Sequence, residues 1–238
     1  IKGVHPSGNE SFQINKIDPL NFGETVWVVK PEDLANIGAF FKTGVFCSTR
    51  TIAVSGDSLK SPKYFSTVIG SSISSLINND EVNDINNYRF INGDPLSGSK
   101  VEYSNYIGFY NNCLSVIEEG NNYRMLGWLP FMYNSVPSLS KTSFSWLLGG
   151  AKKVNTNLNG EERAIVVTGE MEKYFPMDIF PMQLIKACMR GDIEKMESLG
   201  IYEVVPEDFG LVDFSCTSKI EAQEIIKSGI QIMLKEVG

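Results

Sequence analysis

The pattern of apolar and polar positions in the first part of the chain predicts one strand followed by one helix. Residues 25–29 are a run of β-branched and aromatic side chains, which is typical of a strand. After Pro31, apolar residues recur at helical spacing as far as Gly44, a common helix end; they are Leu34, Ile37, Phe40 and Phe41. One strand and one helix cannot close a core. We therefore expect residues 1–47 to be the tail of a larger α/β domain, and the chain to be a C-terminal fragment.

Short apolar runs separated by polar turns characterise residues 48–118. A short helix opened by Ser72 carries apolar residues at helical spacing. Strands are predicted at residues 51–57, 63–70, 88–93 and 113–117. The order strand, strand, helix, strand predicts a small β-grasp-like α+β domain over this range.

Residues 119–175 read as a mostly β connector. Strands are predicted at residues 123–128 and 163–167, on either side of an aromatic and serine-rich stretch at 131–148. The Asn-Gly pair within residues 155–160 predicts a tight hairpin turn, because these two residues adopt positive φ angles readily.

Helical periodicity returns in residues 176–238. Helices are predicted at 182–189 and 221–234, with a short acidic helix between them and a stop and restart at Gly191 and Asp192. We expect the acidic residues of this part to form solvated helix surface rather than an acid–base site; they are Asp178, Asp192, Glu194, Glu207 and Asp208. The whole chain is thus predicted to be an α+β multidomain protein.

Charge and hydrophobicity narrow the partners that the chain could have. The 28 acidic residues exceed the 21 basic residues, and the resulting net charge of −7 argues against nucleic acid and anionic lipid as direct partners. No apolar run reaches the length of about 18 residues that a membrane-spanning helix needs. We therefore expect no direct transmembrane segment.

The cysteines and the single histidine suggest no metal centre. The cysteines are far apart in sequence and form no C-x-x-C pair, so we expect four small buried apolar residues with reduced thiols, as is usual in the cytosol; they are Cys47, Cys113, Cys188 and Cys216. One histidine, His5, excludes a histidine-rich metal site.

Three glycine-rich pieces lack the spacing of a phosphate-binding loop. Residues 54–57 and 93–98 are expected to be strand turns, and Gly149 with Gly150 a hinge or tight turn. The aromatic side chains of residues 131–148 could line an apolar ligand site, but core packing is the preferred interpretation.

Six segments, in their order and spacing, carry a resemblance to a known family; they are residues 4–8, 25–29, 32–38, 50–56, 67–70 and 175–179. The chain resembles the A subunit of the Na⁺-translocating NADH:quinone oxidoreductases over nearly its whole length, and matches the C-terminal half of that protein. More distantly it is similar to the C subunit of Rnf complexes and to the NADH-oxidising flavin subunit of respiratory complex I.

The resemblance implies a definite domain layout. It implies the tail of a Rossmann-like domain at 1–47, a β-grasp domain of the soluble-ligand-binding type at 48–118, a β connector at 119–175, and a helical domain at 176–238. The helical domain would resemble a ferredoxin-like module without clusters. In such modules C-x-x-C-x-x-C-P stands where this chain has residues 214–219, with one cysteine left, whereas a [4Fe–4S] cluster needs about four thiolates.

The resemblance also implies the function and the partners. The family enzyme oxidises NADH, reduces ubiquinone or menaquinone, and exports Na⁺ across the bacterial inner membrane. Its A subunit would be a peripheral protein on the cytoplasmic face, bound to the other subunits, with no cofactor of its own and quinone as a possible ligand. FMN, riboflavin, FAD and Fe–S clusters are expected in the partner subunits.

The loop that helps to hold flavin or nucleotide in the distant relatives would fall at residues 8–10. Asn9 stands there in place of an acidic residue or glycine. No catalytic residue is carried over, and His5, Gly8 and Glu10 are the ligand-loop candidates. Two rival functions are a soluble-ligand-binding β-grasp module without a redox role and a free-standing flavin or NADH enzyme, which the missing glycine-rich loops disfavour.

Overall fold

The computed structural model describes the chain except residues 1–4, 78–81, 83, 121–140, 142–152 and 238. The chain forms two compact units. The helical unit comprises Ile1–Val26, Leu126–Gly149 and Asn159–Gly238, and the sheet unit comprises Trp27–Met125 and Gly150–Leu158. Three regions named in the predictions lie outside the described residues: the strand at 123–128, the glycine pair 149–150 and the aromatic stretch 131–148. Lys141 is the one described residue of that stretch.

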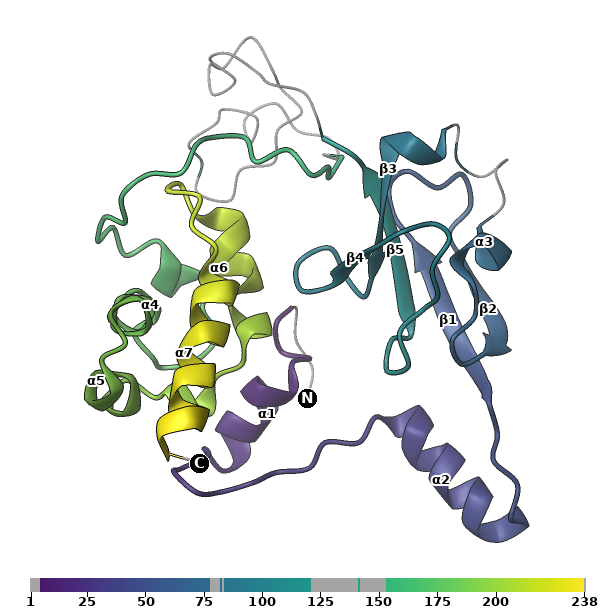
Figure 1. Cartoon of the computed structure of the whole chain (residues 1–238), viewed down its shortest axis with the longest axis horizontal. Coiled ribbons are helices and arrows are strands. Elements are labelled where there is room, and N and C mark those ends of the chain that lie inside the picture. The colour runs from purple at the N-terminus through teal and green to yellow at the C-terminus, as the bar shows by residue number, and fades with distance from the viewer. Residues whose placement is uncertain (1–4, 78–81, 83, 121–140, 142–152, 238) are drawn as a thin grey trace. The chain divides into compact units, whose positions relative to one another are not determined.

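The sheet unit contains a five-stranded mixed sheet (Figure 1). Its strands follow the spatial order β2-β1-β5-β3-β4, in which β1 and β5 are parallel and the other neighbours are antiparallel. The four predicted strands of this region are confirmed, and β4 is an additional short one. The bounds are β1 Thr49–Ser55, β2 Lys63–Val68, β3 Tyr88–Asn92, β4 Ser99–Val101 and β5 Cys113–Glu118.

One face of this sheet packs on the helix predicted after Ser72. That helix is α3, Ile73–Leu76, and Ser72 stands at its N-cap position. Its Ile73 packs into one apolar cluster with Ile52 of β1 and Leu114 of β5, all almost completely buried. A 3-10 turn, η1 (Ile85–Asn87), leads into β3.

Gly56 ends β1 at the predicted turn, with φ of 137°. A Cβ atom at this position would overlap the backbone of Val116, so only glycine lets the two chain segments approach this closely.

Two helices precede the sheet in sequence. Helix α1 is Glu10–Ile17, and α2 is Pro31–Thr43 with Gly44 in the left-handed conformation after it, as predicted. The strand predicted at residues 25–29 is wrong: this segment pairs with no strand among the described residues, and β-propensity alone does not make a ladder. The apolar stripe of α2 does not face a core in the sheet unit, since none of its residues is buried.

After α1, the described part of the helical unit consists of four helices and three 3-10 turns. The predicted helices and the restart at Gly191 and Asp192 are confirmed. The core includes the completely buried side chains of Leu184, Phe209 and Ile226. The elements are η3 Met171–Lys173, α4 Pro181–Arg190, α5 Ile193–Ser198, η4 Ile201–Glu203, η5 Pro206–Phe209, α6 Gly210–Ser215 and α7 Ala222–Val237.

Three further predictions are wrong. Residues 163–167 form no strand, because they have no partner strand among the described residues and lie instead on the turn that precedes α7. Residues 155–160 form no hairpin, although Asn159 has the expected positive φ of 53°. Cys47 is exposed and Cys113 is half-buried, so only Cys188 and Cys216 are the buried cysteines that were expected.

Candidate functional site

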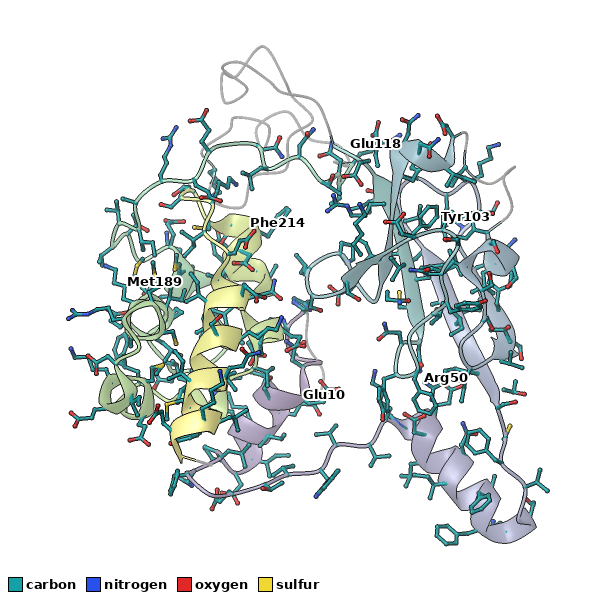
Figure 2. All side chains as sticks on the ribbon, in the orientation of Figure 1. Glu10, Arg50, Tyr103, Glu118, Met189 and Phe214 are labelled. Atoms are coloured by element: carbon teal, nitrogen blue, oxygen red, sulfur yellow. The ribbon has the colours of Figure 1, made fainter. Side chains whose placement is uncertain are left out.

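The predicted ligand-loop residues lie together on the surface of the helical unit. His5 and Gly8 belong to the turn that precedes α1, and Glu10 is the first residue of that helix (Figure 2). All three are exposed. The structure therefore groups these residues in one short segment, but it does not enclose them.

A buried carboxylate holds this segment in place. Asp208 in η5 is 1% exposed, and its Oδ1 accepts hydrogen bonds from Ser11 Oγ at 2.6 Å and Asn9 Nδ2 at 3.0 Å. Its Oδ2 accepts from the backbone N–H of Val205 at 3.0 Å. Charge-assisted bonds of this kind are stronger than neutral ones, so Asp208 ties the start of α1 to the helical unit.

Asp208 corrects the expectation of a uniformly solvated acidic surface. Asp178, Glu194 and Glu207 are not buried, as expected, and Asp192 is half-buried. The side-chain partners of Asp208, Asn9 and Ser11, lie almost two hundred positions away in sequence. Only its place after Pro206, where a capping acid often stands, could have signalled a different role.

A carboxylate, Asp213, stands immediately before residues 214–219, the segment where the resemblance implied the place of a cluster-binding motif. Asp213 accepts hydrogen bonds from the backbone N–H groups of Ala222 at 2.6 Å and Gln223 at 3.3 Å, and from Gln223 Nε2 at 2.9 Å. It thus caps the N-terminus of α7. Burial raises the pKa of Asp213, and these hydrogen bonds oppose that rise. Cys216 is buried a few residues later.

A buried arginine performs a similar task in the sheet unit. Arg50 at the start of β1 is 2% exposed and forms an ion pair with Asp33 of α2 (Figure 2). Its Nη1 donates to the carbonyl oxygen of Phe109 at 2.5 Å, and its guanidinium lies 5.9 Å from the centre of the Phe109 ring. Its Nε has no hydrogen-bond partner among the described residues.

The N-terminal turn of α2 strengthens this attachment. The two carboxylate oxygens of Glu32 accept from the backbone N–H of Thr51 at 3.0 Å and from Asn112 Nδ2 at 2.9 Å. Lys30 Nζ donates to the carbonyl oxygen of Tyr110 at 2.9 Å. The first turn of α2 is therefore joined to β1 and to the loop before β5.

That loop presents three aromatic side chains to solvent. Tyr106, Phe109 and Tyr110 are 65%, 54% and 69% exposed, and the last two rings meet edge to face at 4.9 Å. Exposed aromatic side chains on a backbone held by buried contacts are well suited to a protein interface. Sequence reasoning missed this loop because it sought aromatic residues at 131–148; three aromatic residues within positions 106–110 were the available signal.

In the part of the chain that the structure describes, no group of three or more His, Cys, Asp or Glu residues could hold a metal ion. None of the described helices is long and apolar enough to cross a membrane.

The geometry defines a mixed α/β chain with a five-stranded sheet in one unit and helices in the other. A buried charge in each unit binds one N-terminal helix: Asp208 binds the start of α1, and Arg50 pairs with α2. Two family models match it: the NqrA second alpha/beta domain at residues 1–46 and the NQRA C-terminal domain at residues 51–103. These matches confirm the resemblance to the A subunits of Na⁺-translocating NADH-quinone reductases that the sequence predicted.

Relatives from three bacteria are each named as the A subunit of the Na(+)-translocating NADH-quinone reductase. That of Neisseria meningitidis serogroup B is 33% identical over 235 residues, that of Pasteurella multocida 35% over 240 residues, and that of Haemophilus influenzae 34% over 235 residues. Each match covers 98% of this chain and 52% of the relative. The chain thus spans about half the length of the curated relatives that it matches.

Proposed function

We propose that this chain acts as part of a peripheral subunit of a respiratory complex that couples NADH oxidation and quinone reduction to Na⁺ export. Its role there is that of a docking scaffold on the cytoplasmic face of the bacterial inner membrane. The observation that carries the proposal is the identity of 33–35% with NqrA relatives over 98% of the chain.

Exposed apolar surface supports the docking role. In α2, Leu34 is 62% exposed and Phe41 is 82% exposed, and the braced loop before β5 adds Phe109 and Tyr110. Apolar groups that stand together on a surface are common at protein interfaces. Arg50 and Asp33 at this place pair with each other, so their charges are engaged within the unit.

The proposal includes a finer domain description. Residues 1–47 are proposed as the tail of a Rossmann-like domain. Residues 48–118 are proposed as a β-grasp domain, supported by the strand order and the parallel central pair. We also propose a connector at residues 119–175 and a helical module without clusters at residues 176–238.

Electron transfer would then take place in partner subunits that hold FMN, riboflavin, FAD and Fe–S clusters, and quinone is the one small-molecule ligand proposed for this chain. The rival function as a soluble-ligand-binding module receives no support from the core of the sheet unit, because the protein's own side chains, Ile73 and Leu114 among them, fill the space between α3 and the sheet.

Binding to the complex tests the docking role. The full chain would be added to a Na⁺-translocating reductase complex purified from a strain without NqrA, with the intact NqrA of Pasteurella multocida as the positive control. Saturable binding of both proteins is expected. Binding of the control without binding of this chain would refute the proposal.

Quinone binding is tested separately on the purified chain. Short-chain ubiquinone and menaquinone would be titrated while tryptophan fluorescence is followed, because Trp27 is 90% exposed and Trp128 and Trp146 report on the aromatic stretch. Saturable quenching at micromolar ligand is the expected result if this half contributes to a quinone site. No quenching would remove quinone from the proposal and leave docking untouched.

A further inference from the structure

The chain contains two Asn-Gly pairs with nearly the same neighbours. Asn92 and Gly93 stand between an isoleucine and an aspartate, and Asn159 and Gly160 stand between a leucine and a glutamate. Asparagine is a chemically labile residue, and a glycine after it leaves its own backbone nitrogen unshielded by a side chain. The local sequence therefore gives both pairs a similar reactivity, and a difference between them must come from the fold.

The first pair is fixed in the sheet. Asn92 is the last residue of β3 and is 8% exposed. Its Nδ2 donates to the carbonyl oxygen of Tyr106 at 3.5 Å, and the N–H of Gly93 donates to the carbonyl oxygen of Cys113 at 2.9 Å. The backbone nitrogen of Gly93 cannot turn toward the side chain of Asn92 without the loss of these buried hydrogen bonds.

The second pair lies in an exposed stretch outside the helices and strands. All of residues 158–162 are exposed, and Asn159 has a φ of 53°. Among the described residues, the N–H of Gly160 donates no hydrogen bond. A Cβ atom built on Gly160 would lie 3.1 Å from Lys219 Cε, but the lysine cannot engage this N–H because its ammonium group is a donor only. The backbone nitrogen of Gly160 can therefore approach the side chain of Asn159 without the loss of a hydrogen bond.

This exposed stretch connects two anchored parts of the chain. The N–H of Thr156 donates to the carbonyl oxygen of Glu118 in the sheet unit at 3.2 Å, and the N–H of Arg163 donates to the carbonyl oxygen of Ser218 in the helical unit at 2.8 Å. The helical unit resumes at Asn159. A chemical change at Asn159 would thus alter the segment in which the chain passes from one unit to the other.

We propose that Asn159 is a site of spontaneous covalent modification, at which the asparagine converts through a cyclic imide into aspartate and isoaspartate. The backbone nitrogen of Gly160 attacks Asn159 Cγ, and an N–Cγ bond forms. The bond between Cγ and Nδ2 breaks, and ammonia leaves with the electron pair of that bond and the proton lost from the glycine nitrogen. Water then adds to one of the two imide carbonyl carbons, and the bond from that carbon to the nitrogen breaks. The sequence of steps requires no oxidant or reductant.

The two products differ in the path of the main chain. Ring opening at Cγ gives aspartate with the original backbone. Ring opening at the backbone carbonyl carbon gives isoaspartate, in which the main chain runs through the side chain and is longer by one methylene group. Either product adds a negative charge to a chain of net charge −7, directly before Glu161 and Glu162. This inference is independent of the proposed docking function.

The test is ageing of the folded full chain at pH 7.5. Peptide mass spectrometry would follow the mass gain of deamidation at each asparagine, and methylation by a protein isoaspartate methyltransferase would detect the isoaspartate product. Asn159 is expected to convert several-fold faster than Asn92, the matched residue in the sheet. An equal or lower rate at Asn159 would overturn the proposal.

Two controls separate the fold from the local sequence. In urea the rates at Asn159 and Asn92 should converge, because their neighbours are nearly the same; an advantage of Asn159 that persists would contradict the role of the exposed stretch. The variant Asn159→Gln should stop the mass gain in its peptide, because the longer side chain closes a less favourable ring. A gain that persists in this variant would assign the change to Asn155 or Asn157 and would overturn the proposal.

Discussion

The two helices before the sheet are attached to their units in opposite ways. Helix α1 is tied to the helical unit by a buried acid, Asp208, which accepts hydrogen bonds from Asn9 and Ser11. Helix α2 is tied to the sheet unit by a buried base, Arg50, which pairs with Asp33. In each case a charge in the body of the unit meets polar groups at the start of the helix.

The apolar contacts of the two helices differ. Helix α1 buries Ser11 and packs Phe12 against the core of the helical unit, whereas α2 has no buried residue and exposes Phe41. Polar contacts can position a helix, but removal of apolar area from water supplies most of the stabilisation. Helix α1 thus packs apolar side chains within its unit, whereas the apolar face of α2 is exposed. An exposed apolar face agrees with the proposed docking role.

The largest expected effect comes from breaking the ion pair of α2. The substitution Asp33→Ala leaves the guanidinium of Arg50 buried without its carboxylate, and loss of one partner of a buried pair costs about 3 kcal/mol or more. Urea unfolding should show this loss. Hydrogen exchange of peptides from α2 should rise at the same time, while peptides from α1 stay unchanged.

A rescue variant sharpens this test. Replacing both partners in the double variant Asp33→Ala and Arg50→Met removes the buried charge, so stability should return most of the way to that of the parent. Equal destabilisation by the single and double variants would show that Arg50 acts through packing, and the ion pair would then not explain how α2 is attached.

The second effect concerns α1. The substitution Asp208→Ala removes the acceptor of three hydrogen bonds and leaves the buried hydroxyl of Ser11 without this acceptor, which should cost about 2 kcal/mol. Hydrogen exchange in α1 should increase selectively. The matched control is Asp178→Ala, which removes an exposed carboxylate from the same unit. Equal effects of both substitutions would contradict the anchor role of Asp208.

The third effect tests the apolar difference directly. The substitution Phe12→Ala should destabilise the helical unit by about 1.5 kcal/mol, because it removes a partly buried ring from the core. The substitution Phe41→Ala should change the stability of the isolated chain by less than about 0.5 kcal/mol, since that ring is 82% exposed. In the binding assay with the complex that lacks NqrA, Phe41→Ala is expected to weaken binding. If this substitution lowers stability but leaves binding unchanged, the apolar face of α2 packs inside the protein and is not an interface.

The spacing of apolar residues along the chain predicted most of the helices and the strands of the sheet. The helices around Leu184 and Ile226 and the strands around Ile52 and Leu114 carry their apolar residues at the period of the element, and α4 ends at Gly191, a residue that favours termination. These predictions needed no knowledge of a distant partner.

The failed strand predictions depend on a partner far away in sequence. Residues 25–29 and 163–167 have the composition of strands, but a strand exists only when another strand pairs with it. Asp208 was predicted to be solvated helix surface, because its partner Ser11 lies 197 positions away. The anchors of both helices could not be found from periodicity or motif spacing.

The smallest effect compares a buried ion pair with a more exposed one. Arg89 of β3 donates from Nε to Glu119 Oε2 at 3.0 Å, and Thr156 Oγ1 donates to Glu119 Oε1 at 2.9 Å. The side chain of Arg89 is 34% exposed, against 2% for Arg50. The hydrogen bonds from Arg89 are the main reason why the pKa of Glu119 is lowered.

A lowered carboxyl pKa gives stability that is present above the ordinary value of 4.5 and is lost as the pH falls through the folded-state pKa. The substitution Arg89→Met should therefore cost less than about 1 kcal/mol at pH 7, because solvent weakens a partly exposed pair. The cost should shrink toward zero as the pH is lowered and Glu119 becomes protonated in both states. Urea midpoints of parent and variant, measured from neutral pH down into the acid range, would show this convergence. A constant difference across that range would mean that Arg89 stabilises the sheet unit through packing of its stem, and the contrast between the two arginines would then be one of burial alone.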